Sequence, residues 1–166
     1  MAAEIIGEGG RCQTLGFDAS RDPASQLGHM AAPTHVYYFA ASMIFGGGHV
    51  YSPERVRVFQ DIYVDGFYRL CAYYNDMETA VRVFYPSSVA VENRPKEMTE
   101  YAMAKAAGEV LASDLSRSML WVSVNVARLP RVVTDQTASL VPLDNPDSTE
   151  IMLPLVRAFH RTPVDD

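Results

Sequence analysis

Cysteine and histidine are scarce in this chain of 166 residues, and the few that are present do not gather. The two cysteines, Cys12 and Cys71, lie far apart and show no metal-binding spacing. The histidines form no ligand pattern either: His29, His35, His49 and His160. These absences argue against a structural metal site and a disulfide framework, and they favour a reduced, cytoplasmic protein.

Long apolar runs and clusters of positive charge are also missing. No run is long enough to span a bilayer, and the first residues lack the pattern of a signal peptide. The formal net charge is -6, and no group of lysine and arginine residues offsets it locally. We therefore expect neither a nucleic acid nor a membrane as a partner.

The overall composition is that of a globular protein, with 48% hydrophobic and 20% charged residues. A chain of this length is sufficient for one domain with its own core. No internal repeat or low-complexity linker divides it. We predict that residues 1–166 form a single domain.

Segments with strand and helix patterns alternate along the chain. The expected strands are Arg11–Phe17, Thr34–Ala41, Ala80–Tyr85 and Leu120–Val126. The expected helices are Ala2–Glu8, Arg21–His29, Ser52–Tyr74, Glu97–Arg117 and Pro146–Arg161. Such alternation predicts an α/β fold, with a Rossmann-like parallel sheet and flanking helices.

One stretch brings chemically useful side chains together. Ser87 and Ser88 follow the Ala80–Tyr85 strand, and Tyr101 and Lys105 lie four residues apart on the next helix. Residues at this spacing share a helix face, and ligands bind beyond the carboxyl ends of parallel strands. Because an ammonium group favours the phenolate, Lys105 is expected to lower the pKa of Tyr101. Tyr101 would then exchange a proton with a carbonyl or alcohol oxygen that a serine hydroxyl holds.

Each part of this stretch also has a simpler interpretation. A Tyr-x-x-x-Lys pair alone is usually a half-buried tyrosine beside a solvated lysine, and Ser-Ser after a strand is ordinary turn chemistry. The combination is far more specific: strand, Ser-Ser, loop, Tyr-x-x-x-Lys helix, strand, and then Arg128, Leu129 and Pro130. The combination favours the functional interpretation.

Residues 34 to about 137 resemble a short-chain dehydrogenase/reductase, and residues 84–109 resemble the extended branch of that family. The resemblance implies that Tyr101 is the catalytic acid/base. It implies that Lys105 lowers the pKa of this tyrosine and binds the nicotinamide ribose. Ser88 would be the substrate-orienting hydroxyl, with Ser87 as the second choice. The implied cofactor is NAD or NADP, which supplies the hydride.

The same resemblance assigns further residues to the nucleotide. Asp18 matches the acid that contacts adenine, and the turn at residues 40–42 packs against the cofactor. The segment after the last strand lies by the nicotinamide. The candidate cofactor-binding residues are thus Asp18, Ala40, Ala41, Ser42, Lys105, Arg128, Pro130 and Thr134. Glu109 is interpreted as a solvated or helix-packed acid rather than a catalytic one.

The chain departs from the family pattern on its N-terminal side, where we expect an incomplete domain. The family opens with a strand and a glycine-rich turn whose amides hold the pyrophosphate, and no such element occurs here. Tyr63 stands where the family often has an asparagine on its long helix, so a water relay to Lys105 lacks its usual residue. The exposed edge of Thr34–Ala41 needs a cover. A rearranged Arg11–Phe17 strand, a second copy of the chain, or another polypeptide would supply it.

Three hypotheses for function follow. The first is an NAD(P)-dependent oxidoreductase of the ketoreductase kind, acting alone or as a fragment or subunit of a larger reductase. The apolar loops Met43–Phe45 and Val132–Val133 suggest an acyl or polyketide-like substrate. The second, favoured by the missing turn, is a non-catalytic structural or interaction module without a cofactor. The third is a fold that holds another nucleotide or sugar nucleotide without redox chemistry.

Overall fold

The computed structural model describes residues 2–44, 51–131 and 147–161. The elements in chain order are α1 (Ala2–Gly7), α2 (Pro23–Leu27), β1 (His35–Tyr37), α3 (Pro53–Gln60), the π-helix η1 (Asp61–Gly66), α4 (Phe67–Asp76), β2 (Val81–Ser88), α5 (Ala90–Asn93), α6 (Thr99–Ser118), β3 (Val122–Leu129) and α7 (Ser148–Arg161). Strands and helices alternate along most of this order, as the sequence predicts.

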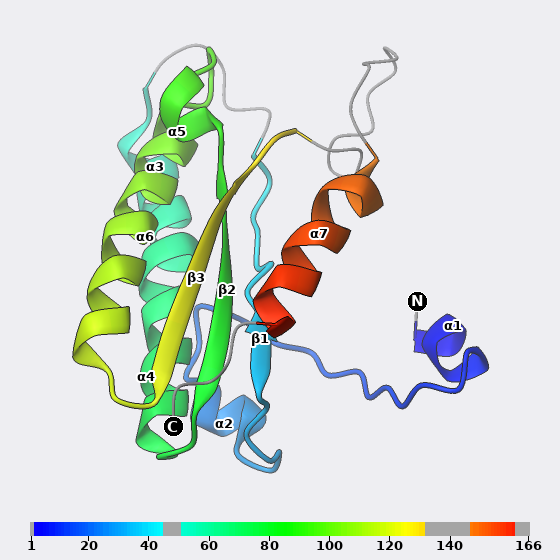
Figure 1. The fold of residues 1–166 in the computed structure, drawn as a ribbon. Coiled ribbons are helices and arrows are strands. Elements are labelled where there is room, and N and C mark those ends of the chain that lie inside the picture. The colour runs from blue at the N-terminus through cyan, green and yellow to red at the C-terminus, as the bar shows by residue number, and fades with distance from the viewer. Residues whose placement is uncertain (1, 45–50, 132–146, 162–166) are drawn as a thin grey trace.

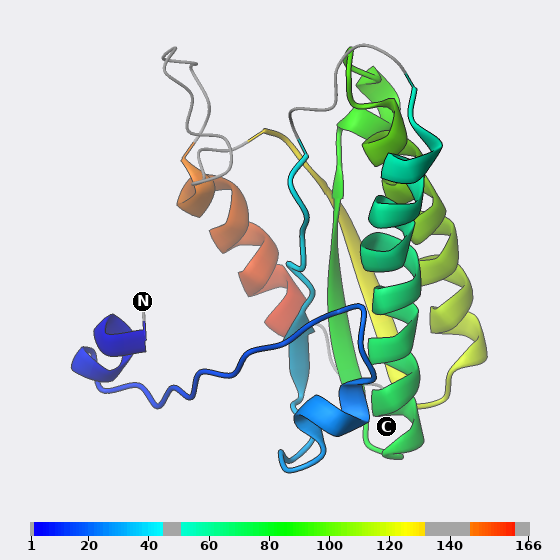
Figure 2. The same ribbon diagram turned by 180° about the vertical axis from the view of Figure 1, so that it is seen from behind.

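The described strands form one parallel sheet in the order β1-β2-β3. The central strand β2 is buried along its length up to Ser87, which explains its apolar sequence. Helices α3, α4 and α6 cover one face of the sheet, and α7 lies on the other face (Figures 1 and 2). The predicted α/β class, a Rossmann-like parallel sheet with flanking helices, is confirmed.

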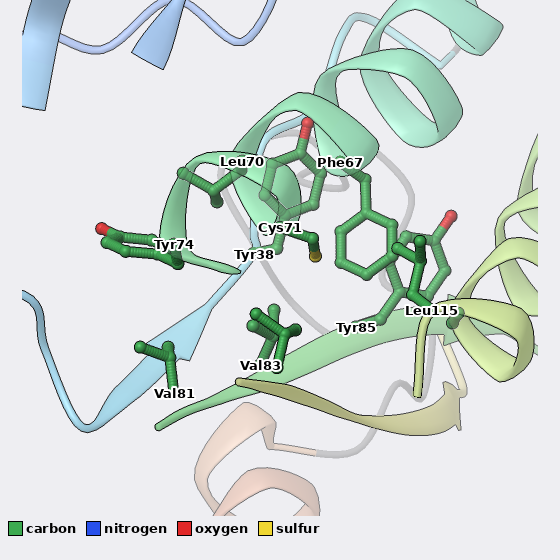
Figure 3. Packing of buried hydrophobic residues seen from close by; sticks show 11 residues of the cluster. Tyr38, Phe67, Leu70, Cys71, Tyr74, Val81, Val83, Tyr85 and Leu115 are labelled. Atoms are coloured by element: carbon green, nitrogen blue, oxygen red, sulfur yellow. The ribbon is translucent and has the colours of Figure 1, made fainter. Parts of the chain in front are cut away.

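The core lies between β2 and the helices α4 and α6 (Figure 3). Val81 and Val83 point from β2 toward α4, where Phe67 and Cys71 are fully buried. Leu115 closes this layer from α6. Alternation along β2 therefore directs every second side chain into this core.

The predicted Ser52–Tyr74 helix is a continuous run of α3, η1 and α4. Its start follows ordinary capping rules, because the Ser52 hydroxyl accepts a hydrogen bond from the Arg55 amide at 3.3 Å. In the π-helical turn, two backbone carbonyls accept hydrogen bonds from tyrosine hydroxyls. Tyr38 donates to Ile62 at 2.6 Å, and Tyr85 donates to the Tyr63 carbonyl at 3.0 Å. We attribute the local π winding to these tertiary contacts.

Helix α7 is fixed to the opposite face of the sheet through Phe159, which is 2% exposed. The ring of Phe159 lies edge-on to the rings of Tyr37 and Phe84. The Arg82 guanidinium lies 4.7 Å from the centre of the Phe159 ring and donates to the Phe159 carbonyl. Arg82 and Phe84 of β2 thus contact α7, while Val81, Val83 and Tyr85 face the main core.

The expected strand Arg11–Phe17 is wrong. This segment has no ladder partner among the described residues, and α1 before it has no buried residue. Both views show α1 apart from the sheet (Figures 1 and 2). A strand needs a neighbouring strand for its backbone groups, and the edge of β1 is not used by this segment. The hypothesis that a rearranged Arg11–Phe17 strand covers this edge is therefore also wrong.

The expected strand Thr34–Ala41 is shorter in the structure. Only His35–Tyr37 joins the ladder, although the Tyr38 amide still donates to the Phe84 carbonyl at 3.0 Å. Beyond this point the chain leaves the sheet toward the site described below. Among the described helices, none has the length and apolarity needed to cross a membrane.

Candidate active site

A cavity of about 480 Å³ opens at the carboxyl end of the parallel strands. The segments after β1, β2 and β3 and the first turns of α6 line it, which is where open α/β sheets bind ligands. Its wall is mostly apolar. The lining residues include Phe39, Ala40, Ala41, Ile44, Tyr63, Pro86, Ser88, Met98, Tyr101, Lys105, Leu129 and Pro130.

The three residues expected to act together meet at this cavity. Ser88 is the last residue of β2, and its hydroxyl accepts a hydrogen bond from the Ala90 amide at 3.1 Å. Tyr101 and Lys105 lie one turn apart on α6 and are 8% and 4% exposed. The helical spacing and the strand end therefore bring a hydroxyl, a phenol and an amine to one wall.

Lys105 is enclosed by aromatic rings and a backbone carbonyl. Its Nζ donates a hydrogen bond to the Pro86 carbonyl at 2.6 Å. The same atom lies 4.0 Å from the centre of the Tyr63 ring, 5.0 Å from that of Tyr85 and 5.8 Å from that of Tyr101. Ring faces attract a cation, so these contacts fix the position of the side chain.

The protonation equilibria of these groups depend on their burial. Burial raises the pKa of Tyr101, and the nearby Ser88 hydroxyl lowers it only in part. Burial also lowers the pKa of Lys105 to about 7, against a smaller opposite effect of Glu109. Burial is the largest cause of the pKa shift of both groups. The lowering of the Tyr101 pKa by Lys105 stays a prediction.

Arg128 does not line the cavity, because Glu109 and Glu92 bind it. Its Nε and Nη2 atoms donate to the two carboxylate oxygens of Glu109, each at 2.7 Å. Ser87 donates to the same carboxylate at 2.5 Å. Hydrogen bonds from Arg128 hold the pKa of Glu109 below its usual range. Glu109 is thus a partly buried ion-pair partner that ties α6 to β3.

The other candidate cofactor residues divide into three groups. Ala40, Ala41 and Pro130 line the cavity, whereas Ser42 does not but lies beside Tyr63. Asp18 lies outside the cavity, where its carboxylate accepts hydrogen bonds from the amide and hydroxyl of Ser20. Thr134 and the Val132–Val133 loop lie outside the described residues.

Sequence reasoning missed Tyr63 as part of the site. Its ring is 1% exposed, touches Lys105 and lies 5.5 Å from the ring of Tyr101. The signal was present, since the family pattern often has an asparagine at this position. The departure thus marks a residue that fills the space beside the lysine.

No protein-family model matches the sequence, and a search of curated proteins finds no match. Solved structures do match. FolM alternative dihydrofolate reductase 1 from Brucella suis, in complex with NADP, is 12% identical with a TM-score of 0.74, over 96% of this chain and 71% of that one. A short-chain dehydrogenase from Burkholderia cenocepacia, in complex with NADP, is 13% identical with a TM-score of 0.72, over 90% and 65%.

A gluconate 5-dehydrogenase from the same bacterium, with NADP and tartrate, is 15% identical with a TM-score of 0.70. That match covers 86% of this chain and 60% of the other, so this chain spans less than two thirds of its length. The chain has the short-chain dehydrogenase fold. The expected resemblance is thereby confirmed at the level of architecture, which fixes where a site lies but not what it does.

In the short-chain dehydrogenase fold described here, the residues of the predicted trio occupy the strand end and the following helix, as the resemblance implies. Their chemistry depends on the cavity itself. It offers a proton donor, a second hydroxyl and an amine within a mostly apolar wall, which suits a small molecule that carries one polar oxygen.

Proposed function

We propose that this protein is an NAD(P)-dependent oxidoreductase that interconverts a carbonyl and an alcohol, with Ser88, Tyr101 and Lys105 as its catalytic residues. The observation that carries the proposal is their convergence on one cavity at the carboxyl end of the sheet. A structural role alone does not require a phenol, an amine and a hydroxyl to share one apolar wall.

In this proposal Tyr101 gives a proton to the carbonyl oxygen or takes one from the alcohol. Ser88 donates a hydrogen bond to the same oxygen and so orients the substrate. A bound nicotinamide nucleotide supplies or accepts the hydride. The apolar lining favours an acyl or polyketide-like ketone over a polar sugar.

The described residues fit one end of such a nucleotide. Ala40 and Ala41 offer small side chains for a flat ring, and Lys105 and Pro130 line the same cavity. Among the glycines within the described ranges, none stands between a strand and a following helix, so the pyrophosphate end has no counterpart there. We propose that the chain works as part of a larger reductase or with a complementing polypeptide that covers the β1 edge.

Nucleotide fluorescence and activity provide the test of this proposal. NADH and NADPH should each be titrated into the protein, followed by assays with medium-chain 3-oxoacyl esters. We expect Tyr101→Phe to keep nucleotide affinity within about twofold and to lose activity by roughly 10² to 10⁴-fold. Tyr68→Phe is the matched control, because Tyr68 is half-exposed on α4 and should behave as the unaltered protein.

A Tyr101→Phe variant with full activity would refute the catalytic assignment. The second candidate, a non-catalytic interaction module, is favoured because no glycine of the described residues stands between a strand and the helix that follows it. If neither nucleotide binds the chain, alone or together with an N-terminal dehydrogenase segment, the module becomes the better interpretation.

We also propose that the protein is cytoplasmic and that it assembles as a homo-oligomer or with that complementing chain. The unpaired outer edge of β1 in the described sheet supports the need for a cover. The net charge of the chain, -6, argues against nucleic-acid and membrane partners.

A further inference from the structure

Lys105 lies in the cavity wall without an ion-pair partner among the described residues. Its side chain is 4% exposed, and its Nζ donates a hydrogen bond to the Pro86 carbonyl at 2.6 Å. Glu109, one turn further along α6, favours the charged form of Lys105. Arg128 and Ser87, however, bind the two oxygens of that carboxylate. A buried ammonium is costly without an anion beside it, so another group has to stabilise its charge.

The Tyr63 ring is the closest of the three aromatic groups around this amine. Its centre lies 4.0 Å from the Lys105 Nζ, compared with 5.0 Å for Tyr85 and 5.8 Å for Tyr101. The attraction between a cation and a ring face weakens with distance, and it is strongest where both partners are removed from water. Tyr63 is 1% exposed, so both conditions are met. Its ring therefore occupies the place that a carboxylate has in an ordinary buried ion pair.

The position of the Tyr63 ring is fixed by its neighbours. The Tyr63 carbonyl accepts a hydrogen bond from the Tyr85 hydroxyl at 3.0 Å in the π-helical turn. The ring stacks on that of Phe59, with centres 6.0 Å apart, and lies edge-on to that of Tyr101, 5.5 Å away. Aromatic pairs prefer such geometries. A ring that is held in this way keeps the amine of Lys105 beside the phenol of Tyr101.

The other titratable groups around Lys105 do not replace this ring. Burial raises the pKa of Tyr85 and of Tyr101, so both phenols are neutral at physiological pH. The charge of Glu109 is paired with that of Arg128. Burial lowers the pKa of Lys105 to about 7, which brings its charged and neutral forms close in free energy. A modest contribution from one ring therefore affects which form predominates.

We infer that Tyr63 is a positioning residue whose ring face stabilises the ammonium of Lys105 beside Tyr101. The inference rests on the proposed function only in treating Lys105 as a catalytic residue. A charged Lys105 favours the phenolate, and so helps Tyr101 to give its proton to a bound oxygen. Tyr63 thus acts on the reaction through Lys105. Its own hydroxyl is not required, because the ring face carries the interaction.

Lysine NMR on the full chain tests this inference without any ligand. The chain has two lysines, so protein made with ¹³Cε-lysine gives two signals, and Lys96→Arg identifies the signal of Lys105. Tyr63→Phe is compared with phenylalanines at position 63 that carry one, two or three fluorines. Fluorine keeps the shape of the ring but withdraws electron density from its face. The midpoint of the Lys105 titration should move by less than about 0.3 pH units in Tyr63→Phe and fall stepwise with fluorine, by about 0.4–1.5 pH units for three.

Fluorination of Phe59 is the matched control. The Phe59 ring is 2% exposed, and the cation that lies over it is Arg55, at 5.5 Å. The Lys105 midpoint should stay constant in this control. A midpoint that does not follow the number of fluorines at position 63, or that moves equally with Phe59, overturns the inference. If the trifluorinated chain does not fold, the chains with one and two fluorines give the same comparison.

Failure of this inference and failure of the oxidoreductase proposal are distinguishable, because the NMR midpoint needs neither nucleotide nor substrate. If the chain reduces a ketone, the limb of its kcat/KM profile that reports Lys105 should move along the pH axis with that midpoint. A midpoint that follows the fluorines in a chain without activity supports the role of Tyr63 and counts against the oxidoreductase. Activity whose pH profile and NMR midpoint both ignore the fluorines has the opposite meaning.

Discussion

Lys105 shows how competing interactions set the charge of one side chain. Ring faces stabilise a cation by about 0.5–2 kcal/mol each, and the Pro86 carbonyl adds one hydrogen bond. The cost of removing an ammonium from water is several kcal/mol, and no ion pair of Lys105 occurs among the described residues to offset it. Burial is the largest effect and lowers the pKa of Lys105 to about 7, so that the charged and neutral forms are close in free energy near physiological pH.

This balance predicts a specific pH dependence of stability. The pKa of Lys105 is about 7 in the folded chain, below its ordinary value of 10.5, so the unfolded chain binds more protons between these values. The free energy of unfolding should therefore rise with pH from about 7 to 10.5 because of this residue. Lys105→Met, which fills a similar space without the charge, should remove that rise.

Urea unfolding at several pH values measures the difference between Lys105→Met and the unaltered chain. The comparison cancels the tyrosines and carboxylates that titrate in both proteins. A gap between the two curves that does not change with pH would contradict the assignment.

At the scale of secondary-structure elements, a glycine allows α6 to pack closely against η1. Gly108 faces Tyr85 and the Tyr63 carbonyl, and a Cβ built at position 108 would overlap the Tyr85 hydroxyl. That hydroxyl donates to the Tyr63 carbonyl, so the helix, the strand and the π-helical turn meet there. The site residues Tyr63 and Lys105 are aligned by this close approach.

Gly108→Ala should destabilise the protein although alanine is the better helix former. The helical gain is about 1 kcal/mol, whereas overpacking a rigid core costs about 1–3 kcal/mol. We expect a net loss of about 1 kcal/mol in urea unfolding, and a smaller loss in a Tyr85→Phe background, where the overlapping oxygen is absent. Gly7→Ala, with nothing within 4 Å of an added Cβ, should cause no such loss. An equal loss in both backgrounds would show that another contact causes it.

The elements that sequence predicts well are those that local pattern determines. The alanine-rich Glu97–Arg117 helix occurs as Thr99–Ser118, and the Ala80–Tyr85 strand occurs as Val81–Ser88. The π-helical turn was not predictable, because the tyrosine hydroxyls that bond its carbonyls come from distant segments of the chain. The predicted Arg11–Phe17 strand does not form, because a local strand pattern cannot show whether a neighbouring strand is there to pair with.

In the candidate site, too, local pattern predicted some features, whereas contacts between distant segments determined the others. Four-residue spacing on one helix placed Tyr101 and Lys105 on a common wall, and the strand end placed Ser88 beside them. The pairing of Arg128 with Glu109 joins residues 19 apart on different elements, so no local pattern reports it. Burial then determined the pKa direction of both Tyr101 and Lys105, which sequence spacing alone did not predict. The catalytic roles of the three residues stay predictions.

At the scale of the whole molecule, exposed apolar side chains lie on the helices that cover the outer side of the sheet. Met103 and Val110 on α6 are 46% and 73% exposed and lie two helical turns apart. Val58, on the neighbouring α3, is 52% exposed. Apolar side chains exposed on two neighbouring helices are typical of an interaction surface, and the same helices carry apolar faces in the sequence. We therefore expect two copies of the chain to associate through α6.

Val110→Glu tests this association, because glutamate is a good helix former and its charge opposes burial in an interface. Sedimentation velocity should show a dimer for the unaltered chain and a monomer for Val110→Glu, with the same far-ultraviolet circular dichroism for both. Leu120→Glu is the control, since Leu120 is 90% exposed in the turn that follows α6, at the amino end of β3. A monomeric unaltered chain, or dissociation by Leu120→Glu alone, would place the interface elsewhere. The β1 edge, with its unpaired backbone groups, would then be the surface that needs a partner.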